Sequence, residues 1–496
     1  MTDLGKRLLG FSPSDSRITA EFQRICGIKI HYAQKDSKEG SHHNGLPASN
    51  GGGNSSINCP SSYVNGTNHS FSNGHFHEAD LKNHHINGIC QNGVANGFVK
   101  KESISNGLKS RIKNSSETNG STKTGHSSNN QTYDQDHSKS KPLVNGHVGE
   151  EDNSEWSVSY SVENPVLYYL FSFGASLGNE IFYILFFSST LWNFDSYVVR
   201  KVLIVWCVIM YLGQAAKDYI RWPRPKSPPV VRLEQRYELE YGMPSTHAMV
   251  GVAIPFGMLI YMSGRYEFHF TYGLLFAIAW SILVSFSRLY LGMHSVLDII
   301  AGIGFAILLM GATAPFVDQV DKFLMHHPHA LPIMVATCII LCFLYPSLDK
   351  WSTARGDTTL VLGVFSGIYA GMWLTGKFHP SDVDYFVTPM PEAPPFSLAL
   401  PPVPDMLLAL VRQVVGVAIV VVVLTGLKFG ILNALANLMS LDPKDPNTKR
   451  HLAVELPYKY VSYFLSAAAA TYVMPLLFLR LGIARPSYYS EIFNLT

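Results

Sequence analysis

The chain has 496 residues, a formal net charge of +2 and 15% charged side chains. Soluble globular domains carry roughly 25% charged residues, so this composition favours a protein with a large membrane-embedded part. A nearly neutral chain also lacks the excess of basic residues that nucleic-acid binding requires. We therefore expect no nucleic-acid partner.

Composition divides the chain into a polar and an apolar part. Residues 1–160 are of low complexity, with repeated Asn, Gly, Ser and His. Such a segment cannot bury enough apolar surface to offset the chain entropy lost on folding, so we predict a disordered N-terminal tail. Within it, residues 20–32 fit either a short strand or a membrane-surface segment.

Beyond residue 160, apolar runs alternate with short or Pro-rich connections. A helix needs about 20 apolar residues to span a bilayer. We predict an all-α polytopic membrane protein with about nine transmembrane helices, at residues 181–192 (extended back toward 166), 202–216, 245–263, 270–286, 296–315, 331–345, 358–374, 406–427 and 461–481. Gly174, Gly178, Asn179 and Glu180 interrupt the first run, so residues 167–173 are alternatively a separate interfacial helix.

Positive charge gathers after the second predicted span, in the segment Lys217-Asp-Tyr-Ile-Arg-Trp-Pro-Arg224-Pro225. Clustered cations suit a phosphate group, and the planar fork of Arg matches phosphate oxygens. The alternative for Lys217 and Arg221 is snorkelling at the end of a span. The prolines around Arg224 favour phosphate binding, because a rigid turn holds a cation in place at little cost in entropy.

A second polar segment, Pro244-Ser245-Thr246-His247, precedes the third span. Ser245 is a good N-cap, and the free backbone N–H groups of a helix start also favour an anion. His247 falls in the first helical turn, where a lone histidine is commonly structural. Beside a phosphate site it becomes a candidate general acid for the leaving alkoxide.

A third segment runs from Ser287 and Arg288 to His294 and Asp298, across the fourth and fifth spans. His294 and Asp298 are four residues apart and share a helix face. A carboxylate there can accept a hydrogen bond from one ring nitrogen and leave the other free to attack. The alternative is a capping contact. A carboxylate within an apolar helix is costly without a partner, which favours the functional interpretation.

The alternation of spans places these three segments on one membrane face. Lys217 ends the second span, Ser245 starts the third, Arg288 ends the fourth and His294 starts the fifth. Ionisable residues at such positions are functional candidates by default. The sequence therefore predicts a phosphate-handling site at a water–lipid boundary.

The pattern Lys-x6-Arg-Pro, Pro-Ser-x-His and Ser-Arg-x5-His-x3-Asp resembles the type 2 phosphatidic acid phosphatase superfamily and, within it, the sphingosine-1-phosphate phosphatases. Thr246 stands where the general family usually has Gly, and the Ser-Thr pair is similar to the sphingosine-phosphate branch. The resemblance covers roughly residues 160–496, with its motifs in 217–298. We accordingly predict a catalytic membrane core at residues 161–320 and additional C-terminal transmembrane helices at 321–496.

The resemblance implies a role for each residue of the motifs. It makes His294 the nucleophile that forms a phosphohistidine, Asp298 its orienting partner, and His247 the acid that protonates the leaving oxygen. The phosphate-binding residues are then Lys217, Arg224, Ser245, Thr246, Ser287 and Arg288. The resemblance also implies no metal and no cofactor, and a multi-pass location in the endoplasmic reticulum membrane.

The expected substrate is a phosphorylated sphingoid lipid, sphingosine 1-phosphate, taken from the lipid bilayer. Two alternatives stay open at the level of sequence. One is a phosphatase for phosphatidate or a polyprenyl diphosphate, and the other is a carrier that binds lipid phosphates without turnover. The side of the membrane that the site faces, the protein partners and the oligomeric state are equally open.

Overall fold

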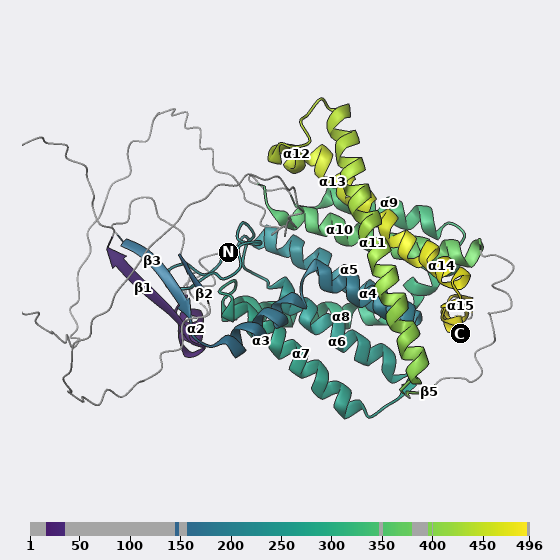
Figure 1. Cartoon of the computed structure of the whole chain (residues 1–496), viewed down its shortest axis with the longest axis horizontal. Helices are drawn as coiled ribbons and strands as arrows, with labels where there is room; N and C mark the ends of the chain where they lie inside the picture. Colours follow the sequence, from purple (N-terminus) through teal and green to yellow (C-terminus); the bar gives the residue numbers. More distant parts are fainter. Residues whose placement is uncertain are drawn as a thin grey trace, which may run out of the picture. The chain divides into compact units, whose positions relative to one another are not determined.

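The computed structural model describes residues 16–34, 144–147, 156–346, 351–378, 395–398 and 400–493, and Figure 1 shows their arrangement. Most of these residues are helical. The helices up to α9 are α2 (Arg17–Ile25), α3 (Pro165–Ser176), α4 (Glu180–Asn193), α5 (Ser196–Ile220), α6 (Thr246–Ser263), α7 (Phe270–Tyr290), α8 (Val296–His326) and α9 (Ala330–Leu344). The remaining helices are α10 (Thr353–Lys377), α11 (Val403–Leu438), α12 (Pro446–Arg450), α13 (Leu452–Ala468), the π-helical turn η2 (Ala469–Val473), α14 (Met474–Arg480) and α15 (Pro486–Phe493).

Seven helical segments of the described chain are long and apolar enough to cross a membrane, which confirms a polytopic α-helical protein. They are α5, α6, α7, α8, α10, α11 and the continuous segment Leu452–Arg480. The predicted number of about nine is approximate, because the described chain has seven such segments, or eight with the bent pair α3 and α4. α9 has 15 residues, about 22 Å, which is shorter than the roughly 30 Å hydrocarbon core. The first predicted span counts as an eighth only if the bent pair α3 and α4 is taken as one.

The first predicted span is two helices, α3 and α4, which meet at an angle of 65°. Residues 165–176 therefore form a helix of their own, as the alternative predicted, and the interfacial position of that helix stays a prediction. Asn164 caps α3 by accepting a hydrogen bond from the backbone N–H of Leu167 at 3.1 Å. Gly178 and Asn179 fall in the break between the two helices. Gly178 is buried in this break, and Oδ1 of Asn179 lies 3.4 Å from Nε2 of His247.

Helix α5 is the central element of the bundle and contacts α4, α6, α8, α10 and α15. Asp195 caps it by accepting a hydrogen bond from the backbone N–H of Tyr197 at 2.8 Å. The helix ends at Arg221, which has a positive φ of 56°. The Pro-rich segment that follows cannot continue a helix, so Arg224 lies in a loop.

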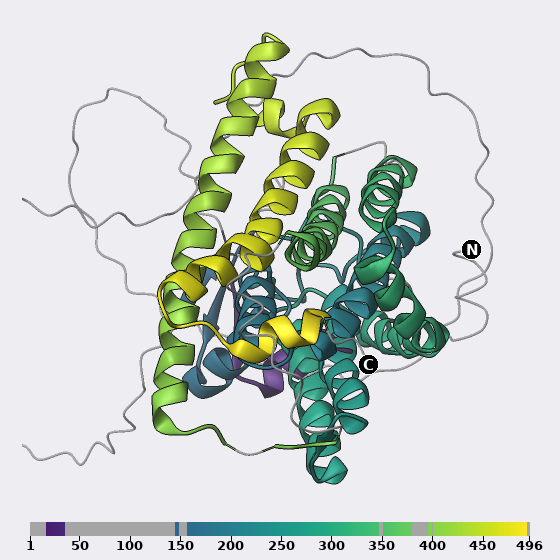
Figure 2. The ribbon, with the colours of Figure 1, turned by 90° about the vertical axis from the view of Figure 1, so that its right-hand side faces the viewer.

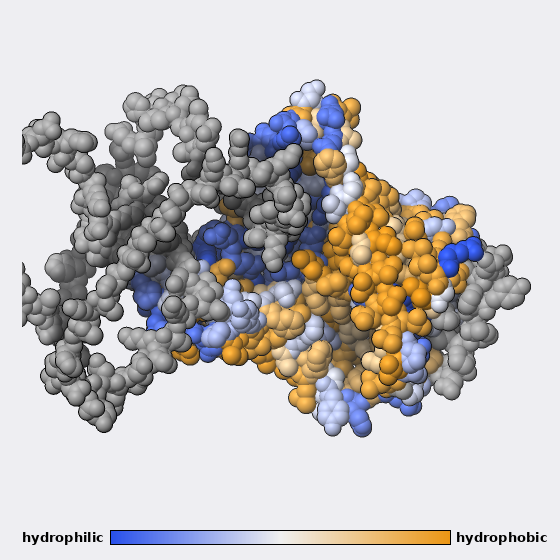
Figure 3. All heavy atoms as spheres, viewed as in Figure 1, coloured by the Kyte–Doolittle hydropathy of each residue, from blue (hydrophilic) through white to orange (hydrophobic). Residues whose placement is uncertain are grey.

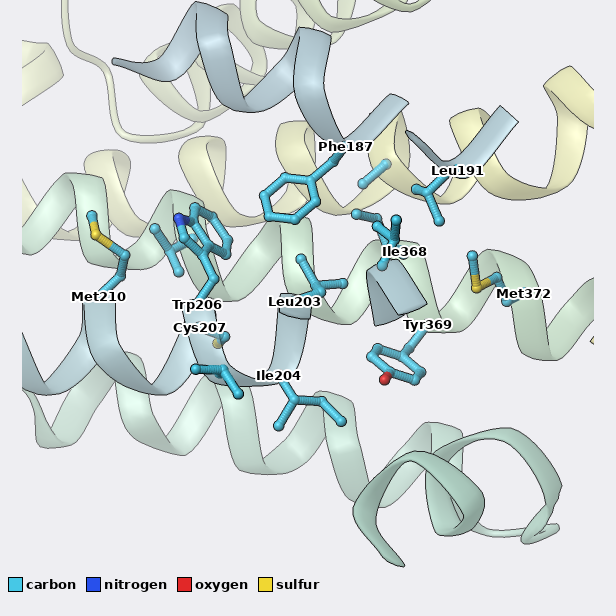
Figure 4. Packing of buried hydrophobic residues seen from close by; sticks show 14 of the residues in the cluster. Phe187, Leu191, Leu203, Ile204, Trp206, Cys207, Met210, Ile368, Tyr369 and Met372 are labelled. Atoms are coloured by element: carbon cyan, nitrogen blue, oxygen red, sulfur yellow. The ribbon is translucent and has the colours of Figure 1, made fainter. Parts of the chain in front are cut away.

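Apolar side chains of α4, α5 and α10 interlock around this central helix. Figure 4 shows Phe187 of α4 directed toward Leu203 and Trp206 of α5, with Ile368 of α10 on another side. The rings of Phe187 and Trp206 lie 5.1 Å apart in an edge-to-face arrangement. On the outside, hydrophobic residues form a broad area over the middle of the bundle, and hydrophilic residues gather toward the end where the strands lie (Figure 3). Figures 1 and 2 both show α11 beside α13, and the two helices pack together.

Strands contribute little to the fold. β1 (Ile28–Gln34) and β2 (Val144–His147) each pair antiparallel with β3 (Trp156–Val162), and Ile28 and Val144 both lie opposite Val162. β4 (Tyr266–Glu267) and β5 (Phe396–Ser397) form a short parallel pair. Residues 17–34 of the predicted disordered tail are thus a helix and a strand, while most of that tail lies outside the described residues.

Candidate active site

One cavity at the end of the bundle collects residues from all three polar segments. Six of the nine predicted site residues line it: Lys217, Arg224, Thr246, His247, Arg288 and His294. They come from the end of α5, the loop that follows it, the start of α6, the end of α7 and the loop before α8. The helix ends that were predicted to lie on one membrane face therefore meet at this cavity.

Two of the cavity's cations contact one residue that the sequence motifs do not contain, Glu240. The ammonium group of Lys217 donates to Oε2 of Glu240 at 2.8 Å and to the hydroxyl of Thr246 at 3.3 Å. The guanidinium of Arg224 donates to the backbone carbonyls of Glu240 at 2.8 Å and Met293 at 2.6 Å. These contacts fix the two cations without using all of their donors.

Burial and neighbouring charges together set the pKa values of Glu240 and Arg224. Burial alone would raise the pKa of Glu240, but the charges of Lys217 and Arg224 outweigh it and hold that pKa below its ordinary value. Burial lowers the pKa of Arg224 to about 10, so the guanidinium still carries its charge near neutral pH. The third cation, Arg288, pairs with Glu234 at 2.7 Å. Hydrogen bonds and ion pairs within the protein thus hold Lys217, Arg224 and Arg288 in position around the cavity.

His294 lies in the tight loop between α7 and α8. Gly292 makes this loop possible: its φ is +68°, and a Cβ there would lie 2.1 Å from the carbonyl oxygen of Val231. The Nε2 atom of His294 is 3.3 Å from Nη1 of Arg224, which can only donate. Nε2 is therefore the unprotonated nitrogen. Burial, together with the charges of Arg224, Arg288 and Lys217, keeps the pKa of His294 well below its ordinary value.

Asp298 sits at the start of α8, close to His294. Its Oδ2 atom is 3.7 Å from Nδ1 of His294, and Nδ1 has no hydrogen-bond partner among the described residues. The predicted hydrogen bond is thus not formed at this distance, because Oδ2 accepts from the backbone N–H of Ser295 at 2.7 Å. The capping alternative is present, since Asp298 and Ser295 form a capping box. The negative charge nevertheless lies on the Nδ1 side of the ring, opposite the nitrogen that faces Arg224.

His247 packs against the break between α3 and α4. Its Nε2 atom is 3.4 Å from Oδ1 of Asn179, and the ring of Tyr237 meets it edge to face at 5.6 Å. A Cβ on Gly178 would lie only 2.2 Å from Cδ2 of His247, so only glycine allows this approach. Sequence reasoning missed Gly178 and Asn179. The signal was available, because polar residues that interrupt an apolar run are functional candidates.

Ser245 and Ser287 do not line the cavity. Ser245 is fully buried as the N-cap of α6, and its own N–H donates to the carbonyl of Asp298 at 3.0 Å. The hydroxyl of Ser287 donates to the carbonyl of Val284 at 2.6 Å. Ser245 thus links the starts of α6 and α8, whereas Ser287 bonds within its own helix α7, and the contact of either serine with phosphate stays a prediction.

Helix α2 supports the site from the N-terminal side. Gln23 donates to the carbonyls of Val231 at 2.7 Å and Tyr290 at 2.9 Å, and it accepts from the N–H of Val231 at 2.9 Å. The hydroxyl of Thr19 donates to the carbonyl of His294 at 3.4 Å. Helix α2, which belongs to the low-complexity tail, therefore stabilises the loop that holds the candidate nucleophile His294. No periodicity in the sequence indicated these contacts.

The rest of the cavity wall comes from residues outside the motifs: Gly178, Glu180, Tyr183, Met210, Gln214, Arg236, Tyr237, Glu240, Asp357, Leu360 and Val361. The last three belong to α10, which lies in the part predicted as additional helices. Across the described ranges no three His, Cys, Asp or Glu side chains lie close enough together to hold a metal ion.

The chain matches known proteins in the region that holds this cavity. Residues 198–321 match the family model described as the PAP2 superfamily. Sphingosine-1-phosphate phosphatase 1 of Rattus norvegicus is 41% identical over 326 residues, which cover 65% of this chain and 74% of the rat protein. The chain belongs to the sphingosine-1-phosphate phosphatase family.

Two further relatives show how the similarity to this family declines. Sphingosine-1-phosphate phosphatase 2 of Homo sapiens is 39% identical over 333 residues, 65% of this chain and 80% of that protein. Lipid phosphate phosphatase delta of Arabidopsis thaliana is 30% identical over 227 residues, 44% of this chain and 55% of that protein. No solved structure matches this member of the sphingosine-1-phosphate phosphatase family.

Proposed function

We propose that the protein is a membrane phosphohydrolase that converts sphingosine 1-phosphate to sphingosine and phosphate through a phosphohistidine on His294. One observation carries this proposal. A buried imidazole, kept neutral by its surroundings, presents an unprotonated Nε2 to a cavity that also holds Lys217, Arg224 and Arg288. A neutral imidazole among fixed cations suits attack on a phosphomonoester, which brings nearly two negative charges.

In the first step, Nε2 of His294 attacks phosphorus, and the bond between phosphorus and the lipid oxygen breaks. His247 gives a proton to that oxygen, which leaves as the alcohol. The phosphoryl oxygens lie against Lys217, Arg224 and Arg288, with the Thr246 hydroxyl beside Lys217. In the second step, water attacks phosphorus, the N–P bond breaks, and His247 takes the proton from water.

Asp298 contributes through charge and position. Its carboxylate, 3.7 Å from Nδ1, favours the tautomer with the proton on Nδ1 and the positive charge that the ring gains as the N–P bond forms. Ser245 contributes by fixing the start of α6 against α8, and we keep Ser245 and Ser287 as predicted phosphate contacts. Residues 161–320 form the proposed catalytic core, with α10 from the C-terminal part closing one wall.

The substrate follows from the relatives and from the position of the cavity. The rat and human relatives quoted above are named for sphingosine 1-phosphate. The cavity lies at the ends of helices that are apolar enough to span a bilayer, so a lipid can reach it from the membrane. From the family resemblance we further propose the endoplasmic reticulum membrane, which co-localisation of the tagged full chain with a marker of that membrane would test.

A substrate panel tests the proposal. The full-length protein, purified in detergent, is assayed for phosphate release from sphingosine 1-phosphate, phosphatidate and a polyprenyl diphosphate, with His294→Ala as the control. We expect the highest kcat/KM for sphingosine 1-phosphate, no turnover by the variant, and trapping of labelled phosphate on histidine in the wild type. Preference for another lipid would contradict the substrate. Residual hydrolysis by the purified variant would contradict the nucleophile, and binding without turnover would favour a carrier.

A further inference from the structure

Beyond Lys217, Arg224 and Arg288, the cavity holds an acidic residue that forms no ion pair with a described side chain. Asp357, on the second turn of α10, lines the cavity and has neither a hydrogen-bond nor an ion-pair partner within the described ranges. The charges of Lys459 and Arg236 act on Asp357 from a distance, but each of these side chains forms its ion pair with another carboxylate. Lys459 binds Glu455 at 2.9 Å, and Arg236 binds Glu180 at 3.4 Å.

The other carboxylates of the cavity already have partners. Glu240 binds Lys217, and Glu180 accepts from the hydroxyl of Tyr463 and lies 3.5 Å from Lys428. An unpaired carboxylate in a membrane-embedded wall is costly, so its presence indicates a cation that arrives with a ligand.

A second, independent feature points the same way. Gln214 lines the same cavity one helical turn before Lys217 on α5, and its side chain is only 4% exposed. Its Oε1 atom has no hydrogen-bond partner among the described residues. A buried amide oxygen without a donor is rare in folded proteins, and it fits a ligand that brings an N–H or O–H group.

The polar cavity also adjoins an apolar crevice that could hold the alkyl chain of a lipid. Glu180, Tyr183 and Leu360 line both the polar cavity and a narrow apolar crevice between α4, α10, α11 and α13. Along α10, Asp357, Leu360, Val364 and Ile368 recur at helical spacing and fall on one face. This face runs from the polar cavity into the crevice over about 16 Å, at 1.5 Å per residue.

Phe187 and Leu191 of α4 and Ile368 of α10 line this crevice, and Figure 4 shows these three side chains near one another. A larger apolar cavity of about 730 Å³ lies between α6, α7 and α8, but it shares no lining residue with the polar cavity. The crevice between α4 and α10, in contrast, shares wall residues with the polar cavity and so connects the phosphate site to an apolar surface.

Resting on the proposed function, we propose that Asp357 and Gln214 form the subsite for the amino-alcohol part of the substrate. The protonated amine of a long-chain amino-alcohol phosphate binds the carboxylate of Asp357, and its N–H or O–H group donates to Oε1 of Gln214. The phosphate then lies at Lys217, Arg224 and His294, and the alkyl chain follows the crevice. Both residues set specificity and take no part in bond breaking.

The test compares two substrates in full-length enzyme reconstituted in lipid vesicles. Sphingosine 1-phosphate carries the amine and the hydroxyl, whereas hexadecyl phosphate carries neither. We expect the wild type to prefer the amino lipid. Asp357→Asn should lower kcat/KM for that lipid about 10- to 150-fold, as expected for a charge-assisted contact, mainly through KM. Hydrolysis of hexadecyl phosphate should stay within about twofold, and it reports that the variant is folded.

Two variants complete the design. Gln214→Leu should lose activity toward the amino lipid selectively, and Asp318→Asn, whose exposed carboxylate pairs with Lys201 on α5, should change neither substrate. Equal losses for both substrates in Asp357→Asn, or no wild-type preference between them, would overturn the subsite while leaving a phosphatase in place. Hydrolysis of neither lipid by the wild type would overturn the proposed function and the subsite with it.

Discussion

Gly178 gives the sharpest test of how the site is assembled. In Gly178→Ala the new Cβ would lie 2.2 Å from Cδ2 of His247, whereas ordinary contacts of a Cβ begin at 3.4 Å. The His247 ring or the break between α3 and α4 must therefore move by about 1.2 Å, the difference between those two distances. A misplacement of about 1 Å at a catalytic group can cost about 10²-fold in rate, which is about 2.7 kcal/mol.

Phosphate release from sphingosine 1-phosphate by the purified variant measures this loss. Since His247 is the proposed acid for the leaving group, we expect a smaller loss for an aryl phosphate, whose leaving group needs no proton. Gly304→Ala is the matched control, because a Cβ at Gly304 meets nothing within 4 Å and α8 continues through it. Full activity of Gly178→Ala, or an equal loss in both glycine variants, would refute the proposed tight contact between the break and His247.

Three further changes probe the same cavity. His247→Ala should lower kcat about 10²- to 10⁴-fold for the lipid and less for an aryl phosphate, and equal losses for both would contradict its role as acid. Glu240→Gln removes the partner of a buried Lys217 and should lower the free energy of unfolding by about 3–5 kcal/mol at neutral pH. Because the pKa of Glu240 lies below its ordinary value of 4.5, the wild type keeps this stability above that pH and loses it as pH falls through the lowered pKa. Thermal unfolding in detergent should therefore show that the melting temperatures of wild type and Glu240→Gln approach each other only at acidic pH. A difference in melting temperature that stays constant below the pKa of Glu240 would contradict the ion pair. Gln23→Leu removes the bonds of Gln23 to the carbonyl of Tyr290 and to both backbone groups of Val231, at a cost of about 1–3 kcal/mol for each buried group. This variant should therefore have a lower melting temperature and a lower kcat. Unchanged values of both would show that the contacts of α2 are dispensable.

The number of membrane spans shows where sequence periodicity was insufficient. Hydropathy located every long apolar helix, because about 20 apolar residues in a row have few other uses. It did not distinguish α9, which is too short, from a span, and it left the character of residues 166–192 open. The bend between α3 and α4 depends on how Gly178 packs against His247, and that contact is between residues 69 positions apart in the chain.

The order of polar segments and apolar runs was enough to bring Lys217, Arg224, Arg288, His247 and His294 into one cavity, because the length of a membrane helix fixes the side on which its ends emerge. Only the folded chain decided what surrounds them. Glu240, which pairs with Lys217, comes from a loop, and Gly178, which contacts His247, comes from a helix break. The unpaired Asp357 comes from a distant helix, and Gln23 comes from the N-terminal region. Their neighbours are set by side-chain packing between segments far apart in the chain, and neither spacing nor hydropathy encodes such contacts.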